Sequence, residues 1–372
     1  MKLRVDRDVL AEAVTWAARS LPQRPPMPVL SGLMLEADVQ GTVTLASFDY
    51  EVSAKVELAA EVSEAGKVLV SGRLLADISK SLPSAPVELE TNGSKVEVTC
   101  GSSHFTLMTM PVDEYPALPE LPAASGIVDS AVFAEAVSQV TMATSRDDTL
   151  PILTGVRVEI EGEKMTLLAT DRYRLAVREL TWRPSRPDLS AVALVRGRTL
   201  SDVAKTLGGD VTVALSENGG RELIGFSSAG RQSTSLLVDG DYPKVRSLFP
   251  ESVPIFAVVA TAQLLEAVRR VALVAERNTP IRFKFSQGNL TLEAGAGDDA
   301  QASEAVESTL HGEDISVGFN PSFIIEGLGA LGADFVRFSF TTPMKPVVIS
   351  GQKAAEGEDD IGYRYLIMPI RI

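Results

Sequence analysis

The amino-acid sequence repeats itself three times, and this repetition restricts the folds open to the chain more than any other feature. One block reads Leu-Ala-Glu-Ala-Val at 10–14, Phe-Ala-Glu-Ala-Val at 133–137 and Leu-Leu-Glu-Ala-Val at 264–268. A second block reads Met-Pro-Val-Leu-Ser-Gly at 27–32 and Leu-Pro-Ile-Leu-Thr-Gly at 150–155. Each spacing is near a third of the 372 residues, which indicates a chain built from repeated structural units.

A third repeated block and two proline-rich segments indicate where one repeat ends and the next begins. Val-Ser-Gly-Arg-Leu-Leu-Ala-Asp at 70–77 matches Val-Arg-Gly-Arg-Thr-Leu-Ser-Asp at 195–202, and Gly-Phe-Asn-Pro-Ser-Phe at 318–323 begins the weaker third copy. Proline-rich segments at 115–122 and 242–254 are the expected linkers, because proline removes a backbone donor and fixes an extended path. We therefore predict three domains, over residues 1–122, 123–250 and 251–372.

Each repeat is expected to contain two helices and several strands. Apolar residues between 10 and 21 recur with the helical period, and Pro22 ends that run. A second helix is indicated before Pro83, and Asn320 is the expected N-cap of its copy in the last repeat. Alternating segments such as 95–99 predict antiparallel strands. The fold class is therefore α+β, with helices against sheets in each of three similar domains.

Composition excludes several classes of protein. The 35 basic and 49 acidic residues give a net charge of -14, so the chain cannot hold nucleic acid through its bulk charge, although a locally basic surface is compatible with it. The single cysteine, Cys100, excludes an intrachain disulfide, and 2 histidines are too few for most metal sites. Neither a signal peptide nor a membrane span is indicated. We expect a reduced, cytoplasmic chain without metal or cofactor.

The motifs together resemble one family. They are Arg-Pro-Pro-Met-Pro-Val-Leu at 24–30, Ala-Thr-Asp-Arg-Tyr-Arg-Leu-Ala-Val at 169–177, Leu-Val-Asp-Gly-Asp-Tyr-Pro at 237–243, Gly-Phe-Asn at 318–320 and Tyr-Leu-Ile-Met-Pro-Ile-Arg-Ile at 365–372. In this order, and over essentially the whole length, the sequence resembles the bacterial DNA polymerase III sliding clamp, the β subunit.

The resemblance implies a fold, a function and partners. Two chains would form a head-to-tail homodimer whose six similar domains close into a ring around duplex DNA, with helices lining the hole and antiparallel sheets outside. Such a processivity factor tethers polymerase and performs no chemistry. The implied partners are a second copy of the chain, duplex DNA, the DNA polymerase III α subunit, the clamp loader complex and other clamp-motif proteins of replication and repair.

Basic residues recur at helical spacing. Arg73 and Lys80 lie seven apart, so they share one helix face, and Arg198 and Lys205 repeat the arrangement. Arg24 matches a position that touches DNA in the family, and the third repeat offers charge on its other helix. Ordinary solvated charges are the alternative interpretation of each residue. The predicted DNA-binding residues are Arg24, Arg73, Lys80, Arg146, Arg198, Lys205 and Arg269.

The resemblance also implies a pocket for short peptides, formed by residues of the second and third repeats near their joint. An apolar cleft of this kind can anchor hydrophobic side chains of a partner's motif, whereas plain core packing is the alternative. The implied pocket residues are Leu153, Thr170, Tyr173, Arg174, Leu175, Pro243, Ser247, Leu248, Phe323, Met344, Pro346, Met368, Pro369, Ile370 and Arg371.

The expected dimer interface joins the first repeat of one chain to the third repeat of the other, since a head-to-tail dimer brings unlike ends together. Phe105 and Leu107, an apolar pair alternating along a strand, would meet Leu273 and Val274, which lie at the end of an apolar helix. The prediction rests on this pattern together with the family resemblance.

Catalysis is not expected. Asp49 and Asp171 recur at a step from strand to turn, where a carboxylate commonly accepts hydrogen bonds from backbone amides. The glycine pairs lack the lysine and hydroxyl residue of a phosphate-binding loop. Two other functions compete with the clamp: a scaffold that binds proteins but not DNA, and a hydrolase that uses the repeated carboxylates.

Overall fold

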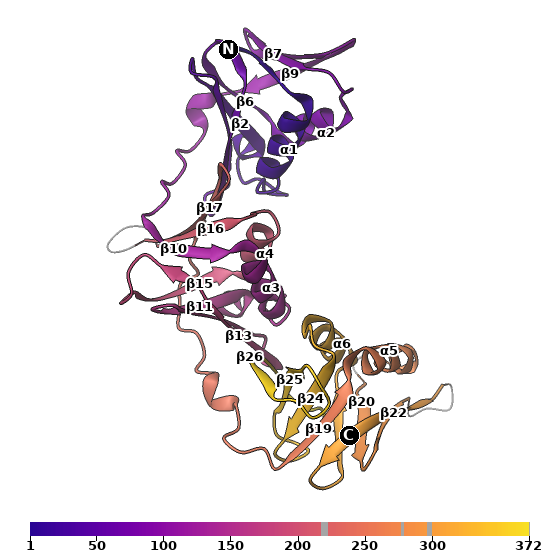
Figure 1. Ribbon diagram of the computed structural model, residues 1–372. Helices are drawn as coiled ribbons and strands as arrows, with labels where there is room; N and C mark the ends of the chain where they lie inside the picture. The colour runs from indigo at the N-terminus through magenta and orange to yellow at the C-terminus, as the bar shows by residue number, and fades with distance from the viewer. Residues whose placement is uncertain (217–221, 277–278, 296–299, 372) are drawn as a thin grey trace. The chain divides into compact units, whose positions relative to one another are not determined.

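The computed structural model describes residues 1–216, 222–276, 279–295 and 300–371. Within these ranges the chain forms two compact units, each with its own continuous antiparallel sheet (Figure 1). Unit 1 comprises Met1–Ala131, Arg183–Arg186 and Asp202–Leu237, and unit 2 comprises Val132–Trp182, Pro187–Ser201 and Val238–Ile372. Among the helices of the described ranges, none has the length and apolar character that crossing a membrane requires.

Unit 1 contains the first repeat and part of the second. Its elements are β1 (Lys2–Val5), α1 (Arg7–Ala18), β2 (Gly32–Ala37), β3 (Thr42–Phe48), β4 (Val52–Ala59), β5 (Glu61–Glu64), β6 (Gly66–Ser71), α2 (Gly72–Ser81), β7 (Val87–Asn92), β8 (Lys95–Cys100), β9 (Ser103–Met110), β10 (Ala124–Asp129), β14 (Arg183–Pro184), β16 (Asp210–Leu215), β17 (Leu223–Ser228) and β18 (Arg231–Leu236). The strands form one sheet in the order β14-β10-β16-β17-β18-β4-β3-β2-β6-β9-β8-β7-β1-β5. Helices α1 and α2 pack against each other and against this sheet.

Unit 2 contains the rest of the second repeat and the third. Its elements are β11 (Gly155–Glu161), β12 (Lys164–Thr170), β13 (Arg174–Thr181), β15 (Ser190–Arg196), β19 (Ile255–Ala260), α5 (Thr261–Val271), β20 (Ile281–Ser286), β21 (Asn289–Ala294), β22 (Ala302–His311), β23 (Ile315–Phe319), α6 (Pro321–Ala330), β24 (Phe335–Phe340), β25 (Val347–Gln352) and β26 (Asp359–Ile367). The sheet order is β15-β11-β12-β13-β26-β25-β24-β19-β22-β21-β20-β23. Helices α5 and α6 pack against each other.

Helices α3 (Ser130–Thr141) and α4 (Gly197–Ala204) complete the second repeat. Five short 3-10 helices lie at the turns of the described chain: η1 (Pro28–Ser31), η2 (Val112–Glu114), η3 (Pro151–Thr154), η4 (Arg246–Leu248) and η5 (Ala272–Val274). The order strand, helix, strands, helix, strands recurs along the chain, and the strand pairings among the described residues are antiparallel. The predicted α+β class with three similar copies is therefore confirmed.

Local sequence signals explain where the helices begin and end. Asp6 caps α1, because its carboxylate accepts the amides of Asp8 at 2.8 Å and Val9 at 3.2 Å. Asn320 caps α6 by accepting the amide of Ser322 at 2.9 Å, as the sequence predicts. Helix α4 ends earlier than expected: the amides of residues 206 and 207 both bond to the carbonyl of residue 203, so Lys205 lies in a turn.

The predicted linkers are anchored to the sheets by equivalent tyrosines. The hydroxyl of Tyr115 accepts the amide of Phe48 at 2.7 Å, and that of Tyr242 accepts the amide of Thr170 at 3.0 Å. Tyr242 and Val245 are buried in one apolar cluster of unit 2. The second linker therefore holds a fixed path along the sheet, and this path positions η4.

Candidate functional site

A tight turn between β12 and β13 organises the predicted pocket. The carboxylate of Asp171 accepts the amides of Tyr173 at 3.0 Å and Arg174 at 3.1 Å, and Arg172 has a positive φ of 81°. The hydroxyl of Thr170 donates to the carbonyl of Arg174 at 2.6 Å and closes the turn. The turn leaves Tyr173 exposed while Arg174 is buried.

The same turn occurs in the first repeat. Asp49 accepts the amides of Glu51 at 3.0 Å and Val52 at 2.7 Å, and Tyr50 has a positive φ of 75°. The predicted role of Asp49 and Asp171 as acceptors of backbone amides is confirmed. A carboxylate engaged in this way shapes the chain, so the recurrence of these two residues reflects the recurrence of the turn.

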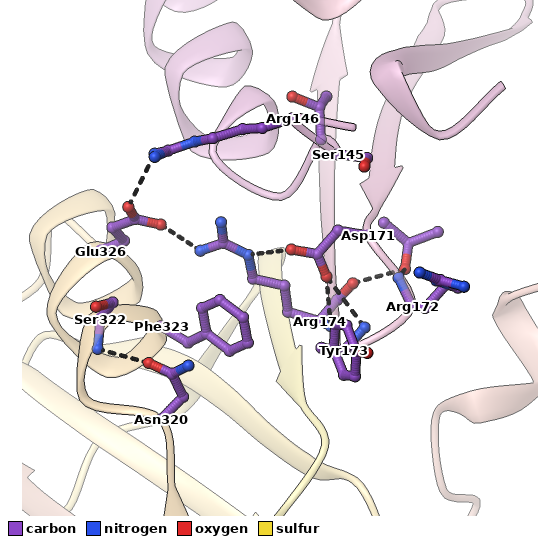
Figure 2. A network of polar contacts seen from close by, with 12 residues as sticks. Ser145, Arg146, Asp171, Arg172, Tyr173, Arg174, Asn320, Ser322, Phe323 and Glu326 are labelled. Carbon is purple, nitrogen blue, oxygen red and sulfur yellow. Dashed lines mark hydrogen bonds and ion pairs between the residues drawn. The ribbon is translucent and has the colours of Figure 1, made fainter. Parts of the chain in front are cut away.

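Arg174 is the centre of a polar network in unit 2 (Figure 2). Its Nε donates to Asp171 at 2.9 Å, and its Nη1 donates to the carboxylate of Glu326 on α6. Its guanidinium carbon lies 4.3 Å from the centroid of the Phe323 ring, within the range of a cation–π contact. The hydroxyl of Tyr365 donates to the carbonyl of Phe323 at 3.1 Å. The network thereby ties the turn before β13 to α6 and β26.

The charge of Arg174 is held in place by these neighbours. Only 5% of its side chain is exposed, and such burial by itself favours the neutral form. Tyr365, Glu326 and Asp171 outweigh that effect and raise the pKa of the guanidinium above its ordinary value. Arg174 is therefore a permanent buried cation with two carboxylate partners, and removing one partner leaves a charge that is incompletely compensated.

The predicted pocket residues all lie in unit 2, at two depths. Strand β13 pairs with β26, and the chain after β26 continues this contact, since the amide of Met368 donates to the carbonyl of Tyr173 at 2.8 Å. Leu153, Thr170, Arg174 and Leu175 are buried. Phe323, Pro346, Met368, Pro369 and Ile370 are half-buried, and Tyr173, Pro243, Ser247, Leu248, Met344 and Arg371 are exposed.

Two points refine the sequence-based expectation for the pocket. Leu175 belongs to the apolar cluster that also contains Tyr242 and Leu366, with Met368 packed against it, so core packing accounts for part of its role. Three large apolar residues are exposed, with exposed fractions of 57% for Tyr173, 42% for Leu248 and 57% for Met344. Large apolar side chains that remain exposed are available for contact with hydrophobic side chains of a partner.

The predicted DNA-binding residues are exposed in each unit. Arg73 and Lys80 both lie on α2, and Arg73 donates to the carbonyl of Pro22 at 2.9 Å, next to the turn that holds Arg24. Arg198 lies on α4 and Lys205 in the turn after it. Two of the residues pair with carboxylates: Arg269 with Glu266 at 2.8 Å and Arg146 with Glu326 at 3.5 Å.

The residues expected at the dimer interface differ in accessibility. Phe105 is 37% exposed on β9 and Leu273 is 85% exposed on η5, while Val274 is half-buried. Leu107 is buried at 2% exposure and pairs with Val96 on β8. Phe105 and Leu107 lie two positions apart on β9 and so on the same face of that strand, with Phe105 the more exposed of the two.

The sequence analysis did not predict two features of unit 2: the contact of Glu326 with Arg174, and a polar cavity. Glu326 follows Phe323 by three positions on α6, a spacing that places both on one helix face, and this is the available signal. The cavity, of about 350 Å³, is lined by residues of β11, β12 and β15 and by Arg246. Hydrogen bonds from Arg246 and Arg157 lower the pKa of Glu159 there, against the opposing effect of its burial.

Two observations in the described ranges concern metal ligands and the single thiol. Within them, no group of three or more His, Cys, Asp or Glu side chains could hold a metal ion. Cys100 is buried, and its thiol donates to the carbonyls of Pro83 and Ala85 at 3.3 Å each.

Comparison with known proteins identifies the family. The sequence matches the N-terminal, central and C-terminal domains of the DNA polymerase III beta subunit over residues 1–119, 127–244 and 246–371. It is 59% identical to the beta sliding clamp of Streptomyces coelicolor, with all of both chains covered. It is 61% identical to that of Micrococcus luteus, over 83% of this chain and all of the relative.

Solved structures agree with the sequence relatives. The DNA polymerase sliding clamp of Bacillus subtilis superposes with a TM-score of 0.92 at 25% identity, covering 100% of this chain and 99% of that one. A sliding clamp of Pseudomonas aeruginosa bound to griselimycin gives 0.92 at 26% identity, with both chains fully covered. The chain belongs to the DNA polymerase III β subunit family, the bacterial sliding clamps, which are processivity factors of DNA replication.

Proposed function

We propose that two copies of this chain close head to tail into a ring around duplex DNA, and that the ring tethers DNA polymerase and other replication and repair proteins through the pocket around Arg174. The three predicted domains of each chain would supply six to the ring. The ring acts by topology and needs no catalytic residue. The observation that carries this proposal is the way strands join successive repeats.

Two joints of the same kind lie within the chain. Strand β18 pairs with β4, and strand β26 pairs with β13, so each joint extends a sheet from one repeat into the next. The registers are equivalent: Ser233 lies opposite Ala54, and Tyr365 lies opposite Ala176. Thr42, the first residue of β3, pairs with Ala59, five positions after Ala54. Lys164, the first residue of β12, pairs with Thr181, five positions after Ala176.

The strands that would make a third such joint are both present, each with an open edge. In the described ranges, β9 pairs with β8 over Ser103–Met108 and with β6 only at Thr109 and Met110. Strand β22 pairs with β21 over Ala302–Glu307 and with β19 only beyond residue 307. An open edge presents unpaired backbone groups that favour pairing with another chain.

The internal repeat predicts the register of the joint between two copies. Ala302 occupies the equivalent position on β22. Asn289, the first residue of β21, pairs with Glu307, five positions after Ala302. Phe105 is the third residue of β9 after its hairpin turn, as Ser233 is the third residue of β18 after the equivalent turn. We therefore propose that Phe105 of one copy lies opposite Ala302 of the other, because a small alanine leaves room for the ring.

The exposed cations support the DNA part of the proposal. Lys and Arg side chains that contact phosphate give position without sequence preference, which suits a protein that must slide. Such contacts are individually weak and fall with salt, whereas a closed ring remains linked to circular DNA by topology. A scaffold that binds proteins but not DNA would show neither behaviour, and a hydrolase would need a turnover that depends on Asp171.

Cysteine cross-linking tests the ring. Phe105→Cys combined with Ala302→Cys should give a covalent dimer under mild oxidation, because opposed strand residues lie within disulfide reach. The control, Phe105→Cys with Glu304→Cys, shifts the pair by two residues, about 7 Å along the strand, and should cross-link poorly. Each single variant should stay monomeric on a non-reducing gel.

The cross-linked ring then tests the link to DNA. After loading onto nicked circular DNA with a clamp loader, it should remain on the circle in denaturing detergent and be released when the circle is cut. Equal cross-linking by both cysteine pairs would contradict the register. A monomer by light scattering at micromolar concentration would overturn the ring itself.

A further inference from the structure

Glu326 contacts residues of both proposed sites. One carboxylate oxygen accepts from Arg174, a pocket residue, and the other accepts from Arg146, a predicted DNA contact (Figure 2). We propose that Glu326 is a positioning residue that fixes Arg174 beneath the peptide pocket and at the same time holds Arg146 away from phosphate. The inference rests on the proposed function, because it assumes a role for Arg146 at DNA and for Arg174 at the pocket.

On the pocket side, Glu326 completes the surroundings of a buried charge. Asp171 holds the Nε of Arg174 at 2.9 Å, and Glu326 holds Nη1 on the other side. Between these anchors the guanidinium lies over the Phe323 ring at 4.3 Å. Phe323 and Glu326 come from the same face of α6, so one helix supplies both the aromatic ring and the carboxylate that keeps Arg174 against it. Loss of the Glu326 charge frees one end of that arginine.

On the DNA side, the contact is easily broken. The side chain of Arg146 is 89% exposed, and its Nη2 lies 3.5 Å from Glu326, so the pair is weak and screened by salt. A phosphate of duplex DNA would have to draw Arg146 from Glu326, and the carboxylate itself repels the phosphate. The intact pair therefore lowers the contribution of Arg146 to DNA binding.

One substitution should consequently move the two affinities in opposite directions. Glu326→Gln keeps the size and hydrogen-bonding capacity of the side chain but removes its charge. We expect peptide affinity to fall by up to about tenfold, because a hydrogen bond to a charged group is roughly twice as strong as a neutral one. We expect duplex affinity to rise by about twofold to fivefold, the range of one exposed ion pair. Glu326→Asp should lie between wild type and Glu326→Gln in peptide affinity.

The chain offers a matched control on α5. Glu266 pairs with Arg269 at 2.8 Å, both side chains are more than half exposed, and Arg269 is also a predicted DNA contact. Glu266→Gln removes the same charge and releases an arginine in the same way, but it touches no pocket residue in the described contacts. It should raise duplex affinity modestly and leave peptide affinity unchanged.

The experiment uses full-length protein and two probes. A peptide with a glutamine followed by spaced leucine and phenylalanine is titrated by calorimetry, and a short fluorescent duplex by anisotropy at low salt, for wild type, Glu326→Gln, Glu326→Asp and Glu266→Gln. The same Glu326→Gln change is then made in Arg146→Ala, where its gain in duplex affinity should shrink to the general effect of one lost charge. Circular dichroism confirms folding of every variant.

The outcomes separate the inference from the function beneath it. If Arg146→Ala weakens duplex binding but Glu326→Gln does not strengthen it, the competition is wrong while the DNA contact stands. If Glu326→Gln and Glu266→Gln have equal effects on the peptide, the positioning role is wrong. If Arg146→Ala leaves duplex affinity unchanged, the proposed DNA role of that residue fails and the inference fails with it. If Glu326→Gln unfolds, unchanged peptide affinity in the folded Glu326→Asp variant overturns the positioning role.

Discussion

The hydroxyl of Tyr242 is predicted to support the pocket from beneath, and its removal by Tyr242→Phe tests this. The hydroxyl accepts the amide of Thr170 at 3.0 Å, and both residues are more than 90% buried. Phenylalanine keeps the ring and its apolar contacts with Val245 and Leu366 but leaves the amide without its acceptor. The change therefore isolates one hydrogen bond.

The expected cost follows from that single unmatched donor. A buried polar group that loses its partner costs about 1–3 kcal/mol, a sizeable share of the roughly 5–15 kcal/mol that stabilises a typical domain. Thr170, whose amide loses its acceptor, also begins the turn that presents Tyr173 and Arg174. Tyr242→Phe should therefore lower both the free energy of unfolding and peptide affinity.

The internal repeat supplies a matched variant for the measurement. Tyr115→Phe removes an equivalent bond, from the amide of Phe48 at 2.7 Å, in unit 1 and away from the pocket residues. Urea unfolding followed by circular dichroism should give similar losses of stability for both variants. Calorimetric titration with peptide should show a severalfold loss for Tyr242→Phe only. Equal peptide affinities of the two variants would refute a specific role of Tyr242 in the turn.

Three further predictions concern stability and the chain end. Gly327→Ala places a Cβ against the ring of the fully buried Tyr365, well inside van der Waals contact, and should cost about 1–3 kcal/mol in thermal unfolding. Gly329→Ala meets no atom within 4 Å and should be neutral or stabilising. Burial raises the pKa of the Tyr115 hydroxyl to about 12, above its unfolded value near 10. The neutral hydroxyl therefore stabilises the folded state fully below pH 10, and this stabilisation is lost as the pH rises through 12. In urea unfolding, the difference in free energy of unfolding between wild type and Tyr115→Phe should narrow across that window. Ending the chain after Ile367 should weaken peptide binding in calorimetry while the dimer persists in light scattering; unchanged peptide affinity in a folded truncation would contradict the pocket assignment.

Local features of the fold could be read from the sequence. The N-cap at Asn320, the helices of each repeat and the amide-accepting turns at Asp49 and Asp171 all depend on residues within a few positions of one another. Short-range geometry of this kind is set by residue type and spacing. Because the block at 10–14 recurs at 133–137 and 264–268, and the other signals recur in part with it, the sequence alone determined the α+β class and its repetition.

The pocket was only partly determined in this way. The family resemblance supplied its positions, but residue type alone could not tell that Leu175 is part of a buried cluster while Tyr173 is exposed. The end of α4 was also missed: the backbone bonds to residue 203 close the helix before Lys205, which the seven-residue spacing from Arg198 had placed on the same helix.

Tertiary structure alone decided which charges meet. Arg174 and Glu326 are 152 positions apart, and Arg146 and Glu326 are 180 apart, so no periodic pattern links them. They come together because β13 pairs with β26, and the hydroxyl of Tyr365 on that strand bonds to α6. Helices and turns follow from neighbouring residues, whereas the pairing of distant charges depends on strand register and on burial, which exist only once the sheet has formed.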